Sequence, residues 1–384
     1  MMTGREKIEA ALSAQGTPEI PAVICYEGIY LRDHWAQVTD CPWWYLHAPD
    51  MERQLAPRRQ EIERTGQDWF DLWLCPSRED REAVRLDVRP EGVFRVDGRT
   101  GEETRLEPPR IGGWSPEGGL HSVQAERLPE TLAEVDEVIP AAPSTDARRI
   151  VAEGRDELAR RLLDEFGAQL YPIRHIATPL WRCYGYWGFE GLMTLVAARP
   201  DLVERACERL LACCIEEAHI AAALGAAGIW LEECMTDMVA PKAFETLNAR
   251  FVRELVRAVR SAGMRSVYYF CGNPAGKWDL LFSVGADALS LEESKKGFDI
   301  DVEEAVDRAA GRCAVLGNLD AIHLLPSASE EVLRAEIARQ IAAGRRNRGR
   351  FLMSLGSPVT PGTSVERVRR YCELVRQLGT EADA

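Results

Sequence analysis

The sequence predicts a (β/α)8 TIM barrel of the α/β class. The 384 residues are 46% hydrophobic, enough for a large core, and a barrel of about 250 residues with insertions accounts for this length. Short apolar or β-branched runs alternate with helical segments, and eight such runs can be counted. This alternation favours a closed parallel barrel, and the structural alternative is a doubly wound open sheet.

The eight predicted strands are spread over the whole chain, and each is a short apolar run between helical or turn segments. They cover residues 21–25, 68–74, 171–178, 228–234, 266–272, 286–293, 313–319 and 351–356. In a parallel barrel their carboxyl ends lie at one rim, where the active site of this fold forms.

The segments between these runs carry helix signals. Residues 201–224 have apolar side chains at helical spacing and are followed by Gly225, a suitable C-cap. The amphipathic segments 241–262 and 329–343 predict two further helices in the second half. The chain therefore continues to alternate between strand and helix up to its last predicted strand.

One stretch, residues 76–143, interrupts the alternation because it is polar and rich in Arg and Glu. Two turn signals, Pro-Glu-Gly and Asp-Gly-Arg, follow the apolar runs 84–88 and 93–96. These features predict a small β-meander inserted after the second strand, followed by a loop around residues 112–113. Residues 1–384 are expected to form a single domain that carries this insertion.

Charge and cysteine content narrow the classes of partner. The net charge is −14, so nucleic acid and anionic membrane surfaces are repelled on average, and a small-molecule substrate is expected. The eleven cysteines are scattered, which favours free thiols in a reducing cytosol. Residues 1–15 lack the apolar core of a signal peptide, and no run of eighteen apolar residues occurs. A cytoplasmic location is therefore expected.

The carboxyl ends of the predicted strands are unusually polar. The polar and thiol residues there are Tyr26, Glu27, Glu232, Glu233, Cys234, Tyr269, Cys271, Glu292, Glu293, Asn318, Asp320 and Ser357. Because reacting groups in barrels of this kind come from the strand ends, these residues are the first candidates for an active site.

A zinc site is one prediction from these residues. Strand alternation places Tyr269 and Cys271 on one face of the fifth strand, where the thiolate can meet a carboxylate of the fourth. Zinc accepts sulfur, nitrogen and oxygen, and catalytic sites keep one position open for a substrate thiol or water. We predict Cys271, Glu233 and Cys234 as ligands, with Glu292 as an alternative third ligand.

Several of these residues also have a structural explanation. A cysteine on a buried strand is often a small hydrophobic residue. For Cys25 and Cys234 this structural explanation and a functional one have equal weight. The pair Glu232 and Glu233 is harder to explain by packing, because buried carboxylates without a cation are costly. His175 lies within the third predicted strand and is expected to be structural.

The second half of the chain resembles the uroporphyrinogen decarboxylase superfamily, which includes zinc-dependent methyltransferases that act between corrinoids and thiols. The resemblance extends over most of the chain. Its specific parts are Phe270-Cys271-Gly272, Gly285-Ala286-Asp287-Ala288, Leu316-Gly317-Asn318-Leu319-Asp320, and Leu355-Gly356-Ser357 with Pro361 and Thr363, together with Pro21-Ala22-Val23 and Tyr26 at the first strand.

The methyltransferase branch is the more similar one, although two of its ligands are replaced. That branch has His-x-Cys on the fifth strand and a second Cys after the eighth; here Tyr269 and Ser357 stand at the His and second-Cys positions. The resemblance thus carries over Cys271 alone, and a metal site must recruit Glu232, Glu233 or Cys234. The decarboxylase branch fits less well because its Arg-rich first loop is replaced by residues 25–28.

The leading functional hypothesis is zinc-dependent methyl transfer between a small methylated donor, a corrinoid and a thiol, with the corrinoid on a partner protein. Tyr269 is the expected acid or hydrogen-bond donor, and Glu232, Asn318 and Ser357 are further catalytic candidates. The alternative enzyme is a metal-independent decarboxylase or lyase that uses Tyr269, Glu233 and Asn318 on a small carboxylated substrate. A non-catalytic binding barrel is the third possibility.

Overall fold

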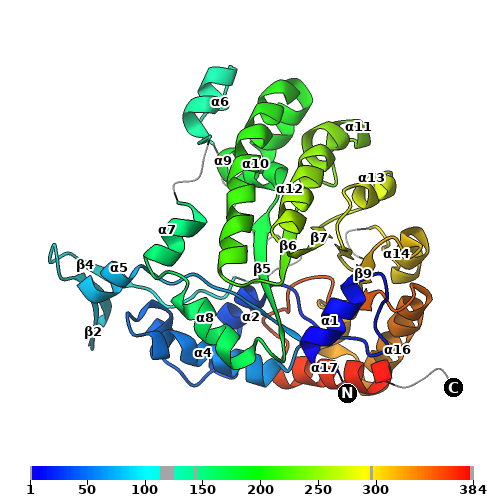
Figure 1. The fold of residues 1–384 in the computed structure, drawn as a ribbon, viewed down its shortest axis with the longest axis horizontal. Coiled ribbons are helices and arrows are strands. Elements are labelled where there is room, and N and C mark those ends of the chain that lie inside the picture. The colour runs from blue at the N-terminus through cyan, green and yellow to red at the C-terminus, as the bar shows by residue number, and fades with distance from the viewer. Residues whose placement is uncertain (1, 113–124, 142–144, 295–296, 381–384) are drawn as a thin grey trace.

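The computed structural model describes residues 2–112, 125–141, 145–294 and 297–380. A curved sheet of seven parallel strands lies at its centre, surrounded by helices (Figure 1). The strands are β1 (Trp69–Asp71), β5 (Tyr171–Ala177), β6 (Gly228–Glu233), β7 (Arg265–Phe270), β8 (Ala288–Leu291), β9 (Ala314–Leu316) and β10 (Phe351–Leu352). They pair in this order, which confirms a TIM-barrel-like fold and seven of the predicted strand positions.

The predicted first strand, residues 21–25, forms only a single bridge, between Ala22 and Met353. On the β10 side, the Val23 amide donates to the Met353 carbonyl at 2.9 Å. On the β1 side, one backbone bond, from the Asp68 amide to the Ala22 carbonyl, is accompanied by two bonds to side chains. The Ala22 amide donates to Asp68 Oδ2 at 2.7 Å and the Ile24 amide to Gln67 Oε1 at 3.0 Å. The segment therefore joins the two edges of the sheet without pairing as a strand.

Helices connect the strands and cover the sheet. They are α1 (Gly4–Leu12), α2 (Glu27–Asp33), α3 (Trp35–Val38), η1 (Trp43–His47), α4 (Met51–Thr65), α5 (Arg78–Ala83), α6 (Leu132–Val138), α7 (Ala147–Ala152), α8 (Glu157–Phe166), α9 (Pro179–Ala198), α10 (Pro200–Ala223), α11 (Pro241–Phe244), η2 (Glu245–Ala249), α12 (Arg250–Ser261), α13 (Trp278–Ser283), α14 (Val302–Ala309), α15 (Leu324–Ser327), α16 (Glu330–Arg346) and α17 (Val365–Thr380). The predicted helices at 201–224 and 329–343 are confirmed as α10 and α16, and that at 241–262 is divided into α11, the π-helix η2 and α12.

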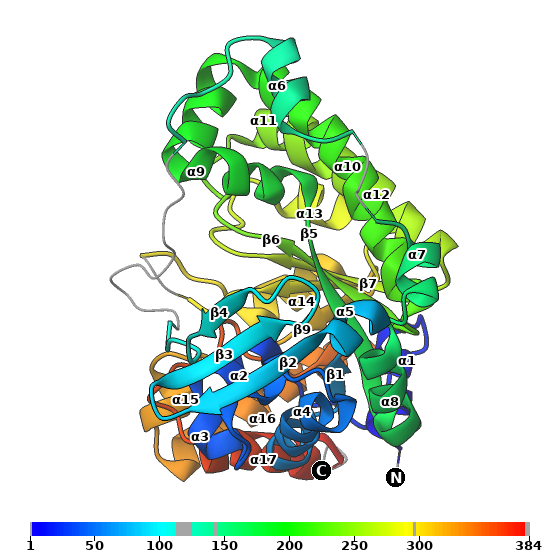
Figure 2. The same cartoon turned by 90° about the vertical axis from the view of Figure 1, so that its left-hand side faces the viewer.

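The insertion contains the predicted meander. Strands β2 (Val84–Arg89), β3 (Gly92–Asp97) and β4 (Glu103–Leu106) pair antiparallel as a separate sheet, which faces the viewer in Figure 2. Its far end returns to the barrel, because the Gly112 amide donates to Asp33 Oδ1 of α2 at 3.1 Å. The predicted loop continues at residue 113, outside the described residues.

The interior of the barrel is aromatic. His175 and Trp230 are register partners on β5 and β6, and their rings stack at 5.5 Å. Trp230 also stacks on Tyr269 of β7 at 4.9 Å. The intervening residues point to the helices: Tyr268 donates to Asn248 of η2 at 2.9 Å. Strand alternation thus separates an aromatic interior from a helix-facing side.

None of the helices in the described part of the chain combines the length and apolar character needed to cross a membrane.

The side-chain bond that closes the barrel yields a stability prediction. Asp68 also contacts the buried Lys7 ammonium at 3.4 Å, so Asp68→Ala leaves both Lys7 and the Ala22 amide without a partner. We expect a loss of about 3 to 5 kcal/mol in unfolding free energy, measured by urea denaturation. Asp40→Ala breaks an exposed ion pair with Arg64 and is expected to cost less than about 1 kcal/mol. Equal losses of unfolding free energy in the two variants would contradict the role of Asp68 in closing the barrel.

A second prediction compares two helical glycines. A Cβ on Gly344 of α16 would lie 2.1 Å from Phe351 Cγ in β10, whereas a Cβ on Gly185 of α9 meets no other heavy atom within 4 Å. Gly344→Ala should therefore destabilise by about 1 to 3 kcal/mol, and Gly185→Ala should stabilise by about 0.5 to 1 kcal/mol. Thermal unfolding midpoints of both variants test the packing of α16 on β10.

Candidate functional site

Two thiols and one carboxylate meet at the carboxyl ends of β6 and β7. Glu232 and Tyr269 are register partners, so Cys234 and Cys271 follow side by side where the strands end. Cys234 Sγ lies 3.4 Å from Glu232 Oε1, and the neighbouring Cys271 contributes to the raised pKa of the Cys234 thiol. Tyr26 donates to Glu232 Oε1 at 3.1 Å. These four residues, Tyr26, Glu232, Cys234 and Cys271, are called the mouth cluster below.

Burial keeps the mouth cluster protonated at two positions. It raises the pKa of the Tyr26 hydroxyl well above its usual value, and Cys234 and Glu232 raise it further. Burial and the neighbouring Cys271 likewise raise the pKa of the Cys234 thiol. The Tyr26 hydroxyl and the Cys234 thiol can therefore act as hydrogen-bond donors to Glu232.

The backbone is strained on both sides of the mouth cluster. Tyr26 has φ of 58° and Met235, next to Cys234, has φ of 57°. Left-handed conformations at residues other than Gly cost roughly 1 to 3 kcal/mol each and concentrate at functional sites. The strain at Tyr26 turns the chain from the closing segment into α2 and keeps the phenol at the mouth.

A cavity of about 450 Å³ adjoins the mouth cluster and is called the mouth cavity below. Tyr26 and Glu232 belong to both. Its other lining residues are Gly28, Ile29, Leu31, Arg32, Leu46, Arg58, Asp71, Trp73, Pro109 and His175. This volume is within the usual range for a small-molecule site, and the mix of apolar and aromatic walls with a few charges is typical of such sites.

The imidazole of His175 lies in the wall of the mouth cavity. Its Nε2 is 3.2 Å from Asp71 Oδ1 at the end of β1. Burial lowers the pKa of His175, but Asp71 outweighs it, and the net shift is upward. Sequence reasoning assigned His175 a structural role and did not single out Asp71; their pairing depends on β1 and β5 being neighbours in the sheet.

The predicted ligand Glu233 points away from the mouth cluster. It accepts a hydrogen bond from Thr178 at 2.5 Å and another from Asn248 of η2, on the helix-facing side of β6. It is fully buried, and burial raises its pKa to about 7. Because neighbouring residues on a strand face opposite sides, Glu232 is the acidic residue of this pair that reaches the mouth cluster.

Three predicted catalytic residues are held in the surrounding framework. Tyr269 donates to the Gly356 carbonyl at 3.1 Å, across the barrel from β7 to the end of β10. The Asn318 amide donates to the carbonyls of Glu292 and Ile300, at 3.0 and 2.8 Å. Ser357 is fully buried. Neither Asn318 nor Ser357 lines the mouth cavity.

The donor chemistry of the mouth cluster suits zinc. The 3.4 Å between Cys234 Sγ and Glu232 Oε1 is close to the separation of about 3.5 Å expected for a sulfur and an oxygen ligand on one tetrahedral zinc. As the side chains stand, however, no three His, Cys, Asp or Glu residues in the described ranges are arranged to hold a metal ion. A zinc ion at the mouth cluster would therefore require its side chains to rearrange.

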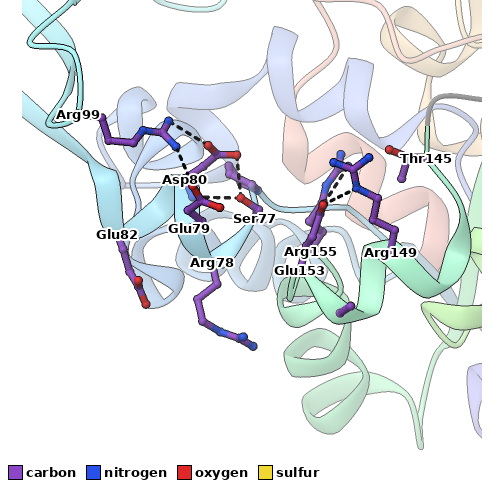
Figure 3. A pocket seen from close by; sticks show the side chains of 12 residues that line it. Ser77, Arg78, Glu79, Asp80, Glu82, Arg99, Thr145, Arg149, Glu153 and Arg155 are labelled. Atoms are coloured by element: carbon purple, nitrogen blue, oxygen red, sulfur yellow. Dashed lines mark hydrogen bonds and ion pairs between the residues drawn. The ribbon is translucent and has the colours of Figure 1, made fainter.

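Another cavity, of about 760 Å³, lies outside the barrel between α5 and α7. Figure 3 shows Arg99 and Arg149 paired with acidic residues, whereas Arg78 is drawn without such a pair. Arg99 binds Asp80 at 3.2 Å, and Arg149 binds Glu153 at 2.5 Å. Internal pairing of this kind leaves little net charge to select a ligand, so the mouth cavity is the stronger candidate.

Comparison with known proteins identifies relatives. The uroporphyrinogen decarboxylase (URO-D) family model matches residues 176–378, more than half of the chain. Uroporphyrinogen decarboxylase from Ralstonia pickettii is 25% identical over 248 residues, which cover 61% of this chain and 65% of that protein. The enzyme from Burkholderia thailandensis is 26% identical over 267 residues, covering 67% and 69%. The match therefore spans slightly less than two thirds of the Ralstonia protein.

A solved structure supports the fold over nearly the full length. A methyltransferase from Methanosarcina mazei superposes with a TM-score of 0.68 at 16% identity, covering 98% of this chain and 99% of that one. At this identity the likeness concerns the fold. The family match over more than half of the chain shows that this chain belongs to the uroporphyrinogen decarboxylase family.

Proposed function

We propose that this chain is a zinc-dependent methyltransferase whose active site is the mouth cluster. Glu232, Cys234 and Cys271 would hold the metal, and the methyl group would move between a small methylated donor, a thiol and a corrinoid carried by a partner protein. The observation that carries the proposal is the meeting of two thiols and one carboxylate at adjacent strand ends beside a cavity. The methyltransferase fold neighbour is consistent with it.

The residues of the chain have distinct tasks in this proposal. Tyr26 holds Glu232 in place through its 3.1 Å hydrogen bond. Trp230 and Tyr269 form the aromatic floor beneath Tyr26, at ring distances of 6.0 and 5.7 Å. When bound, zinc would lower the pKa of a substrate thiol so that it reacts as thiolate.

The decarboxylase or lyase alternative receives less support from the geometry. It requires Tyr269, Glu233 and Asn318 to face one substrate. Tyr269 lies in the barrel interior, whereas Glu233 is bonded to Asn248 on the helix-facing side. The side-chain amide of Asn318 already donates hydrogen bonds to two backbone carbonyls. None of these three side chains lines the mouth cavity.

Metal content is the first prediction from this proposal. Protein purified without added metal should contain about one zinc per chain, since three protein ligands suffice for a catalytic site. Cys271→Ala and Cys234→Ala should each lose most of it, as measured by elemental analysis. Cys41→Ala is the matched control, because Cys41 is also partly exposed but lies in a different part of the chain. Metal-free wild-type protein would contradict the zinc site.

Methyl transfer itself is tested with methylcobalamin and 2-mercaptoethanol. The sulfur takes the methyl group, the cobalt–carbon bond breaks with its electron pair left on cobalt as cob(I)alamin, and the thiol proton goes to solvent. The absorbance of cob(I)alamin measures the rate. Cys271→Ala should reduce it by more than about 100-fold, whereas Cys41→Ala should match the wild type. Equal rates in the two variants would exclude Cys271 from the reaction.

A further inference from the structure

Arg58 of α4 is a buried cation in the wall of the mouth cavity. The residue is 9% exposed, and its guanidinium carbon lies 4.0 Å from the centre of the Trp73 ring. Its Nε and Nη1 atoms are buried and have no hydrogen-bond partner. A buried guanidinium normally makes several hydrogen bonds to acceptors, so this arginine points to a ligand.

The carboxylate that contacts Arg58 makes no hydrogen bond to it. Glu61 Oε2 is 3.7 Å from Arg58 Nη1, an ion-pair contact without a hydrogen bond, and both Glu61 oxygens lack hydrogen-bond partners. Burial raises the pKa of Glu61 well above its usual value even though Arg58 acts in the opposite direction. Burial and Glu61 likewise raise the pKa of Glu27. Both carboxyls therefore hold their protons more strongly than a solvent-exposed carboxyl does.

The other acidic residues of the cavity have partners of their own. Asp71 is paired with His175 at 3.2 Å, and Glu232 accepts the hydrogen bond of Tyr26. The second arginine of the cavity, Arg32, is bound through two of its nitrogens to Asp33, at 2.7 and 3.1 Å. Arg58 is thus the cavity arginine whose positive charge lacks a hydrogen-bonded carboxylate.

Trp73 fixes Arg58 in position, and a glycine makes this possible. A Cβ on Gly28 would lie 2.7 Å from Trp73 Cη2, so the indole fits against the start of α2 because residue 28 has no side chain. The planar guanidinium then lies over the indole, an arrangement that orients it and leaves its edge for a planar anion.

We propose that the mouth cavity binds its small-molecule substrate through a carboxylate that pairs with Arg58, with a flat apolar part against Tyr26 and Trp73. This names a substrate class for the proposed methyltransferase and in that sense rests on that function. A guanidinium binds carboxylate and phosphate alike, but two acidic residues, Asp71 and Glu232, line the same cavity and favour the ligand of smaller negative charge. A monoanionic carboxylate is therefore the group that fits.

Binding of simple probes to the full-length protein tests this without turnover. Isothermal titration calorimetry with benzoate, benzamide and phenyl phosphate compares the same ring with a carboxylate, a neutral amide and a phosphate. We expect benzoate to bind roughly 10- to 100-fold more tightly than benzamide, as charge-assisted hydrogen bonds predict. Absence of saturable benzoate binding, or equal affinity for benzamide, would overturn the proposal. Tighter binding of phenyl phosphate would overturn the choice of carboxylate.

Variants assign the effect to Arg58. Arg58→Gln should reduce benzoate affinity by roughly 10- to 100-fold, to the level of benzamide. Arg59→Gln, the adjacent residue on α4, removes the same charge from an exposed pair with Glu165 and should leave the affinity unchanged. Glu61→Gln should change it less than twofold, whereas a tenfold gain would show that Glu61 is ionised and already neutralises Arg58, against the proposal.

Two further measurements keep the test decisive. Thermal unfolding shows whether Arg58→Gln is folded. If it is not, Arg58→Lys takes its place, because lysine keeps the charge but not the planar donor pair. Arg58→Lys should weaken benzoate binding several-fold, and unchanged affinity would contradict the proposal. Cys41→Ala, which changes a thiol outside the mouth cavity, should bind benzoate like the wild type. Failure of methyl transfer with intact Arg58-dependent binding would thus disprove the proposed function alone.

Discussion

The geometry of the barrel mouth depends on the carboxylate of Asp68, which hydrogen-bonds the first segment of the barrel where a full strand pairing is missing. Asp68 accepts the amide of Ala22 at 2.7 Å, and its own amide donates to the Ala22 carbonyl at 2.8 Å. This pair of bonds attaches the first segment of the barrel to β1, while Met353 attaches it to β10. Tyr26 follows four residues later, so the position of its phenol over Glu232 and Cys234 is set by this closure.

Two features could be predicted because they depend on short-range sequence patterns: the positions of the strands, and the side of the fifth strand that Tyr269 and Cys271 share. Period-two alternation placed Tyr269 and Cys271 together, and the structure has both on the interior side of β7. The same alternation requires Glu232 and Glu233 to face opposite sides, but it does not say which one faces inward. That choice is made by Thr178 and Asn248, which bind Glu233 from distant parts of the chain.

The rest of the candidate site could not be predicted for a related reason. Arg58, Trp73 and His175 come from a helix, a strand end and another strand, and no local pattern links them. The missing first strand has the same cause, since the side chains of Asp68 and Gln67 make bonds that backbone patterns do not reveal. Long-range contacts of this kind become visible only when the elements are assembled.

The two family positions that differ in this chain are connected in space. Where the methyltransferase branch is expected to have His on the fifth strand and a second Cys after the eighth, the hydroxyl of Tyr269 bonds to the carbonyl of Gly356, the residue before Ser357. A hydrogen bond across the barrel thus joins the two places where metal ligands are expected. Cys234 offers a replacement donor from the neighbouring strand.

The inserted meander also reaches the mouth. Pro109, at its far end, lines the mouth cavity, and the Gly112 amide is held by Asp33, whose carboxylate also binds Arg32 in the same wall. The shape of the cavity is therefore set by two parts of the chain with separate folding constraints. Changes in the length or sequence of the insertion can alter which molecules the barrel accepts while the strands, the closing carboxylate and the thiols stay as they are.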